Sequence, residues 1–367
     1  VELKGDASDA KASRIPRLTL SCDLTRTPES LRFDRLRLES AMADIDAAGE
    51  LALSRDAAPP AGRVSGKLRA DLAMLGEAFP HLLDMPEGFA VKGGALYLSG
   101  EAARDARSAQ LRFDAKAERL ELTARGKRLL FDKPLTVALA GRRTAAGTKI
   151  DRFALACPYG RVTAWGATDA FECHLTADLT ALSEETARFI GLRGAGARGR
   201  AEMHLRVTTP RLRSHRGDLT LELKDFNLTG LTRKPLAFQS ASLTATAVAD
   251  FDERGRFAGA RDVALALSGP AFAVRVAAAA VAPRAEGRLL PDTRGAEITV
   301  EGNLANALAM AQGSGTLPAL IEVRGDLRLH SDLEIADGIL RAENIDASLG
   351  ELSFALMEQR VVEPTIT

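Results

Sequence analysis

Aromatic residues are scarce in this 367-residue chain, where Phe, Tyr and Trp together make up 5% of the sequence. Neither sign of charge is in excess, because 49 Lys and Arg balance 49 Asp and Glu. Proteins that bind nucleic acids usually carry a basic surplus, so we expect no nucleic-acid partner. The apolar residues that remain are mostly alanine, leucine and valine.

Cysteine is almost as rare, with Cys22, Cys157 and Cys173 as its three occurrences. They form no CxxC pair and show no metal-site spacing, and an odd count argues against a framework of disulfides. A single bridge between Cys157 and Cys173 is left open.

Long hydrophobic runs are absent too, since no stretch reaches the roughly 18 apolar residues of a membrane-spanning helix. The nearest approach is the segment 271–282, which Arg275 interrupts. No signal peptide is recognisable at the start. The chain begins at Val1 rather than at methionine, and we expect it to be a piece of a longer protein.

Signatures of catalysis are missing. The sequence has no HExxH, GxSxG, GxxxxGK or GxGxxG motif in a suitable context. No spacing singles out a pair of carboxylates for acid–base chemistry. We therefore expect neither an enzyme nor a cofactor or metal site.

What the sequence does contain is a repeat, marked three times by the same features in the same order. The first marker is a strand-like Leu-Thr segment: LTLSC at 18, LTVAL at 135 and LTATA at 243. The second is a leucine-rich segment with a central Asp or Asn: LRADLAML at 68, LTADLTAL at 175 and VEGNLANAL at 300. The third is a glycine about 22 residues further on, expected to start another strand: Gly94, Gly199 and Gly325. Such recurrence predicts a repeat of about 110 residues.

A short helix is expected once in each repeat. Asp71, Asp178 and Asn303 are good N-cap residues, because their side-chain oxygens can accept a backbone N–H of the first turn. Leucines follow each cap at helical spacing. A partner-docking leucine motif is the alternative, but recurrence at a fixed place favours a structural joint.

Between the markers, apolar and polar residues alternate with period 2, which predicts antiparallel strands with one apolar and one wet face. We expect eight or nine strands in each repeat. By the same alternation, His204 and His330 fall on the polar face and should face solvent. The residues expected to line the apolar face are Leu96, Leu98, Leu111, Phe113, Val137, Leu139, Met203, Leu205, Leu221, Leu223, Leu265, Leu267, Leu327 and Leu329.

An apolar face of this size is unfavourable in water, so it has to be covered by another part of the protein or by a ligand. It can be buried against a second sheet, wound into a solenoid, or left as the groove of one strongly curved sheet. In the last case the groove is a candidate for ligand or membrane contact, and small branched aliphatic walls suit flexible acyl chains.

The segments FDRLRLESAMADIDAAGELAL (33–53) and IDRFALACPYGRVTAWGAT (150–168), with GKLRADLAML and LTADLTAL, resemble the AsmA-like/TamB family of Gram-negative envelope proteins. The resemblance implies an elongated, strongly curved antiparallel β-sheet, or β-taco, of about three repeats with a few short helices. It implies a periplasmic location, with an inner-membrane anchor in the full-length protein.

The function implied by this resemblance is a non-enzymatic lipid conduit that carries phospholipid acyl chains along its groove between the inner and outer membranes. The alternative is an envelope scaffold that assists outer-membrane protein assembly by strand pairing, with an outer-membrane protein as partner. A secreted adhesin built as a β-solenoid is a third possibility. The expected organisation is an incoming strand (1–17), then repeats at 18–134, 135–242 and 243–367.

Overall fold

The computed structural model describes residues 18–53, 61–78, 88–124, 126–131, 133–190, 196–211, 213–230, 236–283, 292–313, 321–336, 339–356 and 359–366. Within these ranges the chain forms twenty β-strands and three short α-helices, which confirms the all-β expectation. By its internal contacts the chain divides into two compact units, Val1–Thr168 (unit 1) and Asp169–Thr367 (unit 2).

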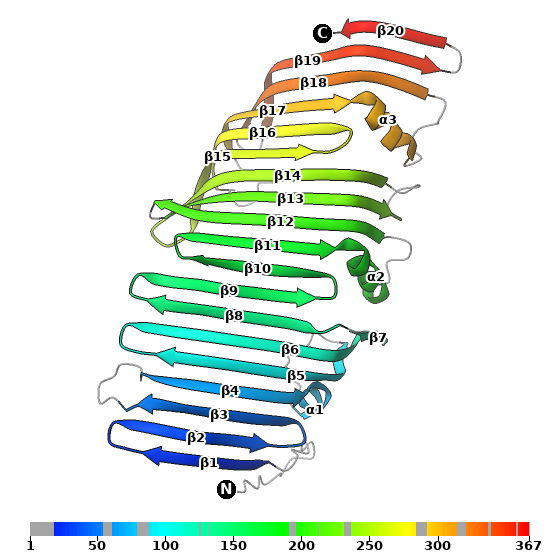
Figure 1. Ribbon diagram of the computed structural model, residues 1–367. Coiled ribbons are helices and arrows are strands. Elements are labelled where there is room, and N and C mark those ends of the chain that lie inside the picture. The colour runs from blue at the N-terminus through cyan, green and yellow to red at the C-terminus, as the bar shows by residue number, and fades with distance from the viewer. Residues whose placement is uncertain are drawn as a thin grey trace. The chain divides into compact units, whose positions relative to one another are not determined.

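Unit 1 holds one antiparallel sheet in which the strands follow one another in chain order (Figure 1). The short strand β7 pairs with the end of β6, so the next full-length neighbour of β6 is β8. Its elements are β1 (Thr19–Arg26), β2 (Ser30–Glu39), β3 (Ala43–Ala52), β4 (Gly62–Asp71), α1 (Leu72–Ala78), β5 (Phe89–Arg104), β6 (Ser108–Ala124), β7 (Lys127–Leu130), β8 (Leu135–Thr144), β9 (Gly147–Cys157) and β10 (Gly160–Ala167).

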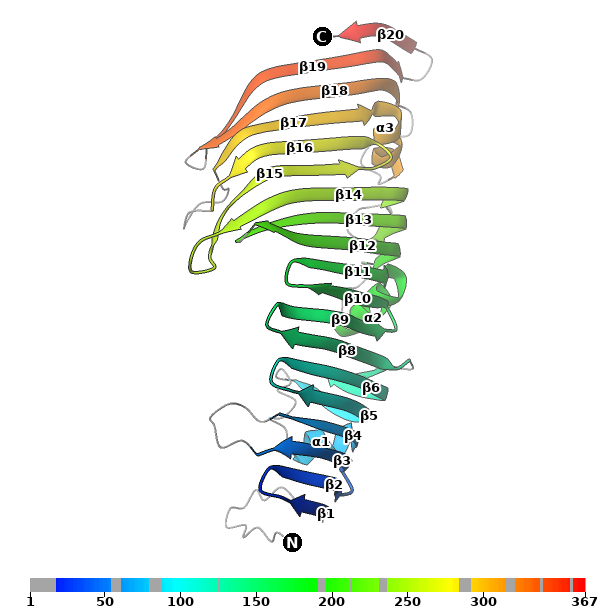
Figure 2. The ribbon, with the colours of Figure 1, turned by 60° about the vertical axis from the view of Figure 1, so that its left-hand side comes forward.

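Unit 2 is built in the same way, as consecutive antiparallel strands from β11 to β20. Figure 2 shows that β15 to β19 curve strongly along their length, as expected. Its elements are β11 (Ala170–Asp178), α2 (Leu179–Ile190), β12 (Gly196–Arg211), β13 (Ser214–Thr229), β14 (Leu236–Phe251), β15 (Phe257–Ser268), β16 (Phe272–Val281), β17 (Thr293–Asn303), α3 (Leu304–Gly313), β18 (Ile321–Ala336), β19 (Ile339–Leu356) and β20 (Gln359–Ile366).

The predicted helical joint is present three times, at the end of β4, β11 and β17. Asp71 Oδ1 accepts a hydrogen bond from the Met74 N–H at 3.0 Å, and Asp178 Oδ1 accepts those of residues 180 and 181 at 3.0 Å each. Asn303 Oδ1 accepts the Asn306 N–H at 3.0 Å. Each cap satisfies an N–H that the helix itself cannot pair, so the helix begins directly at the strand end. The helices α1, α2 and α3 then contact the strand that follows, β5, β12 and β18.

The three repeat glycines do not start strands as expected; each lies inside one, at a β-bulge. Gly94, Gly199 and Gly325 have φ of +128°, +114° and +144°, where L-residues are strained. The ladder to the next strand shifts at each of them, and that strand carries a left-handed residue opposite: Arg119, Asp225 and Glu351. Such bulges bend and twist a strand locally.

These bulges sit at a fixed place beside the helical joint. The residue after each glycine is the direct cross-strand partner of the cap residue: Ala95 pairs with Asp71, Arg200 with Asp178 and Asp326 with Asn303. The strand, cap, helix and bulge therefore form one structural unit that recurs three times, once in unit 1 and twice in unit 2.

The expected number of strands is higher than the number found, since the described residues hold twenty strands, fewer than eight or nine for each of three repeats. The reason is strand length: β5, β6, β12, β13, β14, β18 and β19 run for 16 to 18 residues. The boundary between the two units, at 168/169, falls inside the predicted second repeat, so the repeat boundaries stay a prediction. Residues 1–17 lie outside the described residues.

Burial in the described residues is sparse. Ten apolar side chains are buried, six of them alanines, and no large side chain is fully buried. A face covered by a second sheet would hold large, fully buried side chains. The sandwich considered for the apolar face therefore does not fit the described strands, and the alternating antiparallel order does not fit a parallel solenoid.

Candidate functional site

The strand register gathers aliphatic side chains into rows that cross the sheet of unit 2. Residues paired directly across neighbouring strands stand on the same face, so a chain of such pairs defines a row. One row runs through Leu175, Met203, Leu221, Leu243, Leu267, Val274, Val300 and Leu329, from β11 to β18. The row beside it runs through Cys173, Leu205, Leu219, Ala245, Leu265, Val276 and Ile298. We call this surface the unit-2 apolar face.

Unit 1 has a corresponding surface, the unit-1 apolar face. Its main row runs through Leu20, Leu38, Ile45, Leu68, Leu98, Ala115, Val137, Leu155 and Val162. The adjacent row runs through Cys22, Leu36, Ala47, Gly66, Gly100, Phe113, Leu139, Phe153 and Ala164.

All fourteen residues predicted to line an apolar face lie on these two surfaces. The register places Leu96, Leu98, Leu111, Phe113, Val137 and Leu139 on the unit-1 apolar face. It places Met203, Leu205, Leu221, Leu223, Leu265, Leu267, Leu327 and Leu329 on the unit-2 apolar face. Their placement on a common face in each unit follows from the register, whereas lipid binding by them stays a prediction.

These side chains are only partly covered. Leu111 is 48% exposed, Leu265 37% and Leu267 36%, and none of the other eleven is buried. Exposed aliphatic side chains standing next to one another form the kind of contiguous apolar strip that usually contacts a ligand, a membrane or a partner.

One part of the unit-1 apolar face is bare of large side chains. Ala47, Gly66 and Gly100 are consecutive members of one row, on β3, β4 and β5. A Cβ added at Gly66 would lie 3.4 Å from the Ala47 Cβ, and one at Gly100 would lie 3.8 Å from Phe113 Cδ2. Beside the row of Ile45, Leu68 and Leu98, these three positions carry a methyl group or a hydrogen in place of a large side chain.

The three cysteines are free thiols, so the disulfide left open between Cys157 and Cys173 is not formed. Cys22 and Cys173 belong to the apolar rows, and Cys157 stands two residues after Leu155 on the same strand. They act as small apolar residues of these surfaces.

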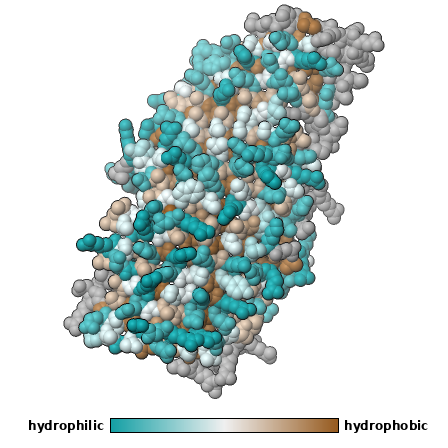
Figure 3. Space-filling view, in the orientation of Figure 1, coloured by the Kyte–Doolittle hydropathy of each residue, from teal (hydrophilic) through white to brown (hydrophobic). Residues whose placement is uncertain are grey.

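The opposite face of each sheet is polar and rich in ion pairs. In unit 2, Lys224 Nζ lies 3.0 Å from Glu202 Oε2 and 3.2 Å from Glu222 Oε2, and these hydrogen bonds raise the pKa of Lys224. Arg275 pairs with Glu301 at 3.4 Å. Exposed pairs of this kind contribute little to stability, but their charges keep this face polar and hydrated. Figure 3 shows hydrophilic side chains spread over one side of the molecule, with apolar positions between them.

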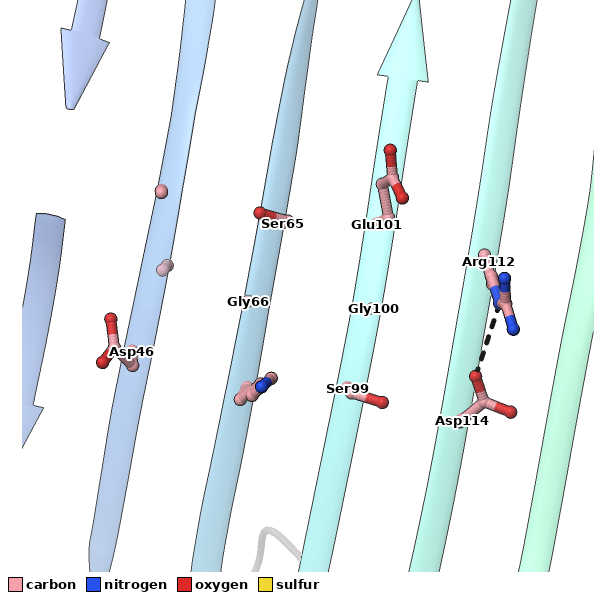
Figure 4. Close-up of a pocket in the computed structure, with 11 residues that line it drawn as sticks. Asp46, Ser65, Gly66, Ser99, Gly100, Glu101, Arg112 and Asp114 are labelled. Carbon is pink, nitrogen blue, oxygen red and sulfur yellow. Dashed lines mark ion pairs between the residues drawn. The ribbon is translucent and has the colours of Figure 1, made fainter. Parts of the chain in front are cut away.

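A hollow on the polar face of unit 1 has a volume of about 570 Å³ and lies over β3 to β6 (Figure 4). Its polar side chains carry both signs of charge, and Arg112 Nε pairs with Asp114 Oδ2 at 3.7 Å. The residues labelled in Figure 4 are Asp46, Ser65, Gly66, Ser99, Gly100, Glu101, Arg112 and Asp114.

The two histidines expected to face solvent differ in surroundings. His330 is exposed, and its Nδ1 lies 3.2 Å from Thr299 Oγ1, so that expectation is confirmed. His204 is on the polar face but only half-exposed. Its cross-strand partner is His174, and the ring of His174 covers it, with the two ring centroids 4.0 Å apart. The sequence alone missed this pair, since His174 and His204 come together only through the register of β11 and β12.

Comparison of the chain with family models, with characterised proteins and with solved structures finds no match. None of the helices in the described ranges has the length and apolar character needed to cross a membrane.

Proposed function

We propose that this chain is a non-enzymatic segment of a lipid conduit, in which phospholipid acyl chains lie along the apolar faces of its sheets. The observation that supports the proposal is the unbroken row of mostly aliphatic side chains that crosses neighbouring strands and stays half-exposed. The resemblance to the AsmA-like/TamB family supplies the setting, a periplasm-spanning protein between the inner and outer membranes.

The rows are long enough to hold an extended hydrocarbon chain. Neighbouring strands lie about 4.8 Å apart, so the nine-membered row of unit 1 extends over about 38 Å. Leucine, valine and isoleucine present flexible, non-planar surfaces, and aromatic residues are few. Beside the leucine row, Ala47, Gly66 and Gly100 carry no large side chain.

Photo-crosslinking at adjacent positions of one strand tests the proposal. A photoreactive residue at Leu221 or Leu327 on the unit-2 apolar face is expected to capture phospholipid in cells. The same residue at Thr220 or Arg328, one position away on the polar face, is the matched control and should capture none. Equal capture on both faces, or no capture on either, would contradict the proposal.

The scaffold alternative is favoured by one observation. Every residue of β1 is exposed, and among the described residues β1 pairs with β2 alone, so an added strand would pair with its other edge. Leu221→Asp separates the two functions. It should abolish lipid capture while leaving strand addition at the β1 edge intact.

A further inference from the structure

Three potential metal ligands meet on the polar face of unit 2, away from the apolar faces. They are Glu172 and His174 on β11 and His204 on β12. His174 and His204 are direct cross-strand partners, and Glu172 stands two residues before His174 on the same face. One donor atom from each residue lies within 4.8 Å of the donor atoms of the other two.

The ring of His204 has an unusual environment for a surface position. It stacks on His174 with the ring centroids 4.0 Å apart and the planes at 22°. Its Nε2 atom is almost inaccessible to solvent and has no hydrogen-bond partner among the described residues. A covered ring nitrogen without a partner loses the hydrogen bond that water would give it, so a ligand at this atom would compensate for the loss.

Two imidazoles and a carboxylate suit a divalent transition metal such as zinc. Zinc binds nitrogen and carboxylate oxygen at about 2.0–2.2 Å, and sites with three protein ligands leave a fourth position for water. Two ligands of tetrahedral zinc lie about 3.3 Å apart, given those bond lengths. The donor atoms all lie within 4.8 Å of one another, so each pair has to approach by at most about 1.5 Å to reach this spacing.

The carboxylate of Glu172 has a second neighbour that bears on this geometry. Arg206, its cross-strand partner on β12, places Nε 3.6 Å from Glu172 Oε1. A carboxylate has two oxygens, so Arg206 can hold one while the other reaches the metal. Contacts of this kind orient metal ligands in known sites.

We propose that Glu172, His174 and His204 form a binding site for one divalent transition-metal ion of the zinc class, which cross-links β11 and β12. The site is independent of the apolar faces and of the lipid function proposed for them.

Calorimetric titration of the purified chain with zinc chloride tests the site. The wild type is expected to bind one ion at this site, and H174Q, H204Q and E172Q should each weaken that binding by at least about tenfold. H330Q is the matched control, because His330 also lies on the polar face but contacts Thr299 rather than another histidine. Circular dichroism confirms that each variant folds. Binding that is unchanged in H204Q, or an equal loss in H330Q, would overturn the proposal.

A measurement on the wild type alone avoids any effect of substitution on folding. Zinc is expected to protect His174 and His204 from chemical modification of imidazole and to leave His215 and His330 reactive, as read by mass spectrometry. Equal modification of His204 with and without zinc would also overturn the proposal.

Discussion

At the scale of single residues, the repeat glycines are needed for their backbone conformation. They adopt a positive φ at bulges inside strands and do not mark the start of a strand. Gly199 is the clearest case, because a Cβ there would lie 2.6 Å from the Lys224 carbonyl oxygen and 2.7 Å from that of Asp225. Its φ of +114° also excludes relaxed L-residues. The bulge beside each helical joint therefore depends on glycine.

Gly199→Ala is expected to lower the free energy of unfolding by about 1–3 kcal/mol, because the added methyl clashes with backbone and φ is unfavourable. Denaturant unfolding of the purified chain measures this. Gly217→Ala is the matched control on the neighbouring strand, since a Cβ at Gly217 meets nothing within 4 Å. Equal loss in the two variants would show that the bulge does not require Gly199.

Asp250 provides a pH-dependent contribution to stability. The carboxylate of Asp250 accepts hydrogen bonds from the Ser214 hydroxyl and from Arg261 Nε, the latter at 3.1 Å. Both lower the pKa of Asp250 below its usual value, and the Ser214 hydrogen bond has the larger effect. A lowered folded-state pKa contributes stability above the unfolded value of about 3.9, and this contribution is lost as the pH falls through the folded-state pKa.

Asp250→Asn is therefore expected to lower the unfolding midpoint at neutral pH, and its difference from the wild type should shrink below about pH 4. Thermal denaturation over a pH series checks this. A difference that stays constant down to strongly acid pH would argue against an ionised Asp250 as the source.

At the scale of secondary-structure elements, the strand that ends in a capped helix is the recurring part. The cap is a direct side-chain-to-backbone hydrogen bond in all three copies, and the residue after the bulge glycine pairs with the cap residue each time. The cap thus sets where the helix begins, and its pairing with the residue after the glycine sets the position of the bulge on the neighbouring strand.

Asp178→Ala should destabilise the chain by about 1 kcal/mol, because two N–H groups of α2 lose their acceptor. Urea denaturation provides the measurement. Asp178→Asn keeps an acceptor oxygen and should retain most of the stability. An alanine variant as stable as the asparagine variant would mean that the cap contributes nothing.

Features that depend on residues close together in the sequence could be predicted, whereas features that depend on the pairing of distant strands could not. Asp71, Asp178 and Asn303 were identified as caps because a cap acts within three residues of itself. The apolar face of Met203, Leu205 and their counterparts followed from period-2 alternation. The left-handed partner of each bulge and the His174–His204 pair depend on register, which joins residues far apart in sequence.

At the scale of the whole molecule, each unit is a sheet whose apolar face remains half-exposed across consecutive strands. We propose that acyl chains occupy these faces. Leu221, in the main row of unit 2, is flanked on its strand by Thr220 on the opposite face, which makes the two positions a natural pair for comparison.

Native mass spectrometry of the chain purified from a Gram-negative periplasm tests this claim most directly. We expect the wild type and Thr220→Asp to carry phospholipid. Leu221→Asp, shown to be folded by circular dichroism, should lose it because a carboxylate disfavours contact with hydrocarbon. A lipid-free wild type, or an equal lipid load in Leu221→Asp and Thr220→Asp, would contradict the account.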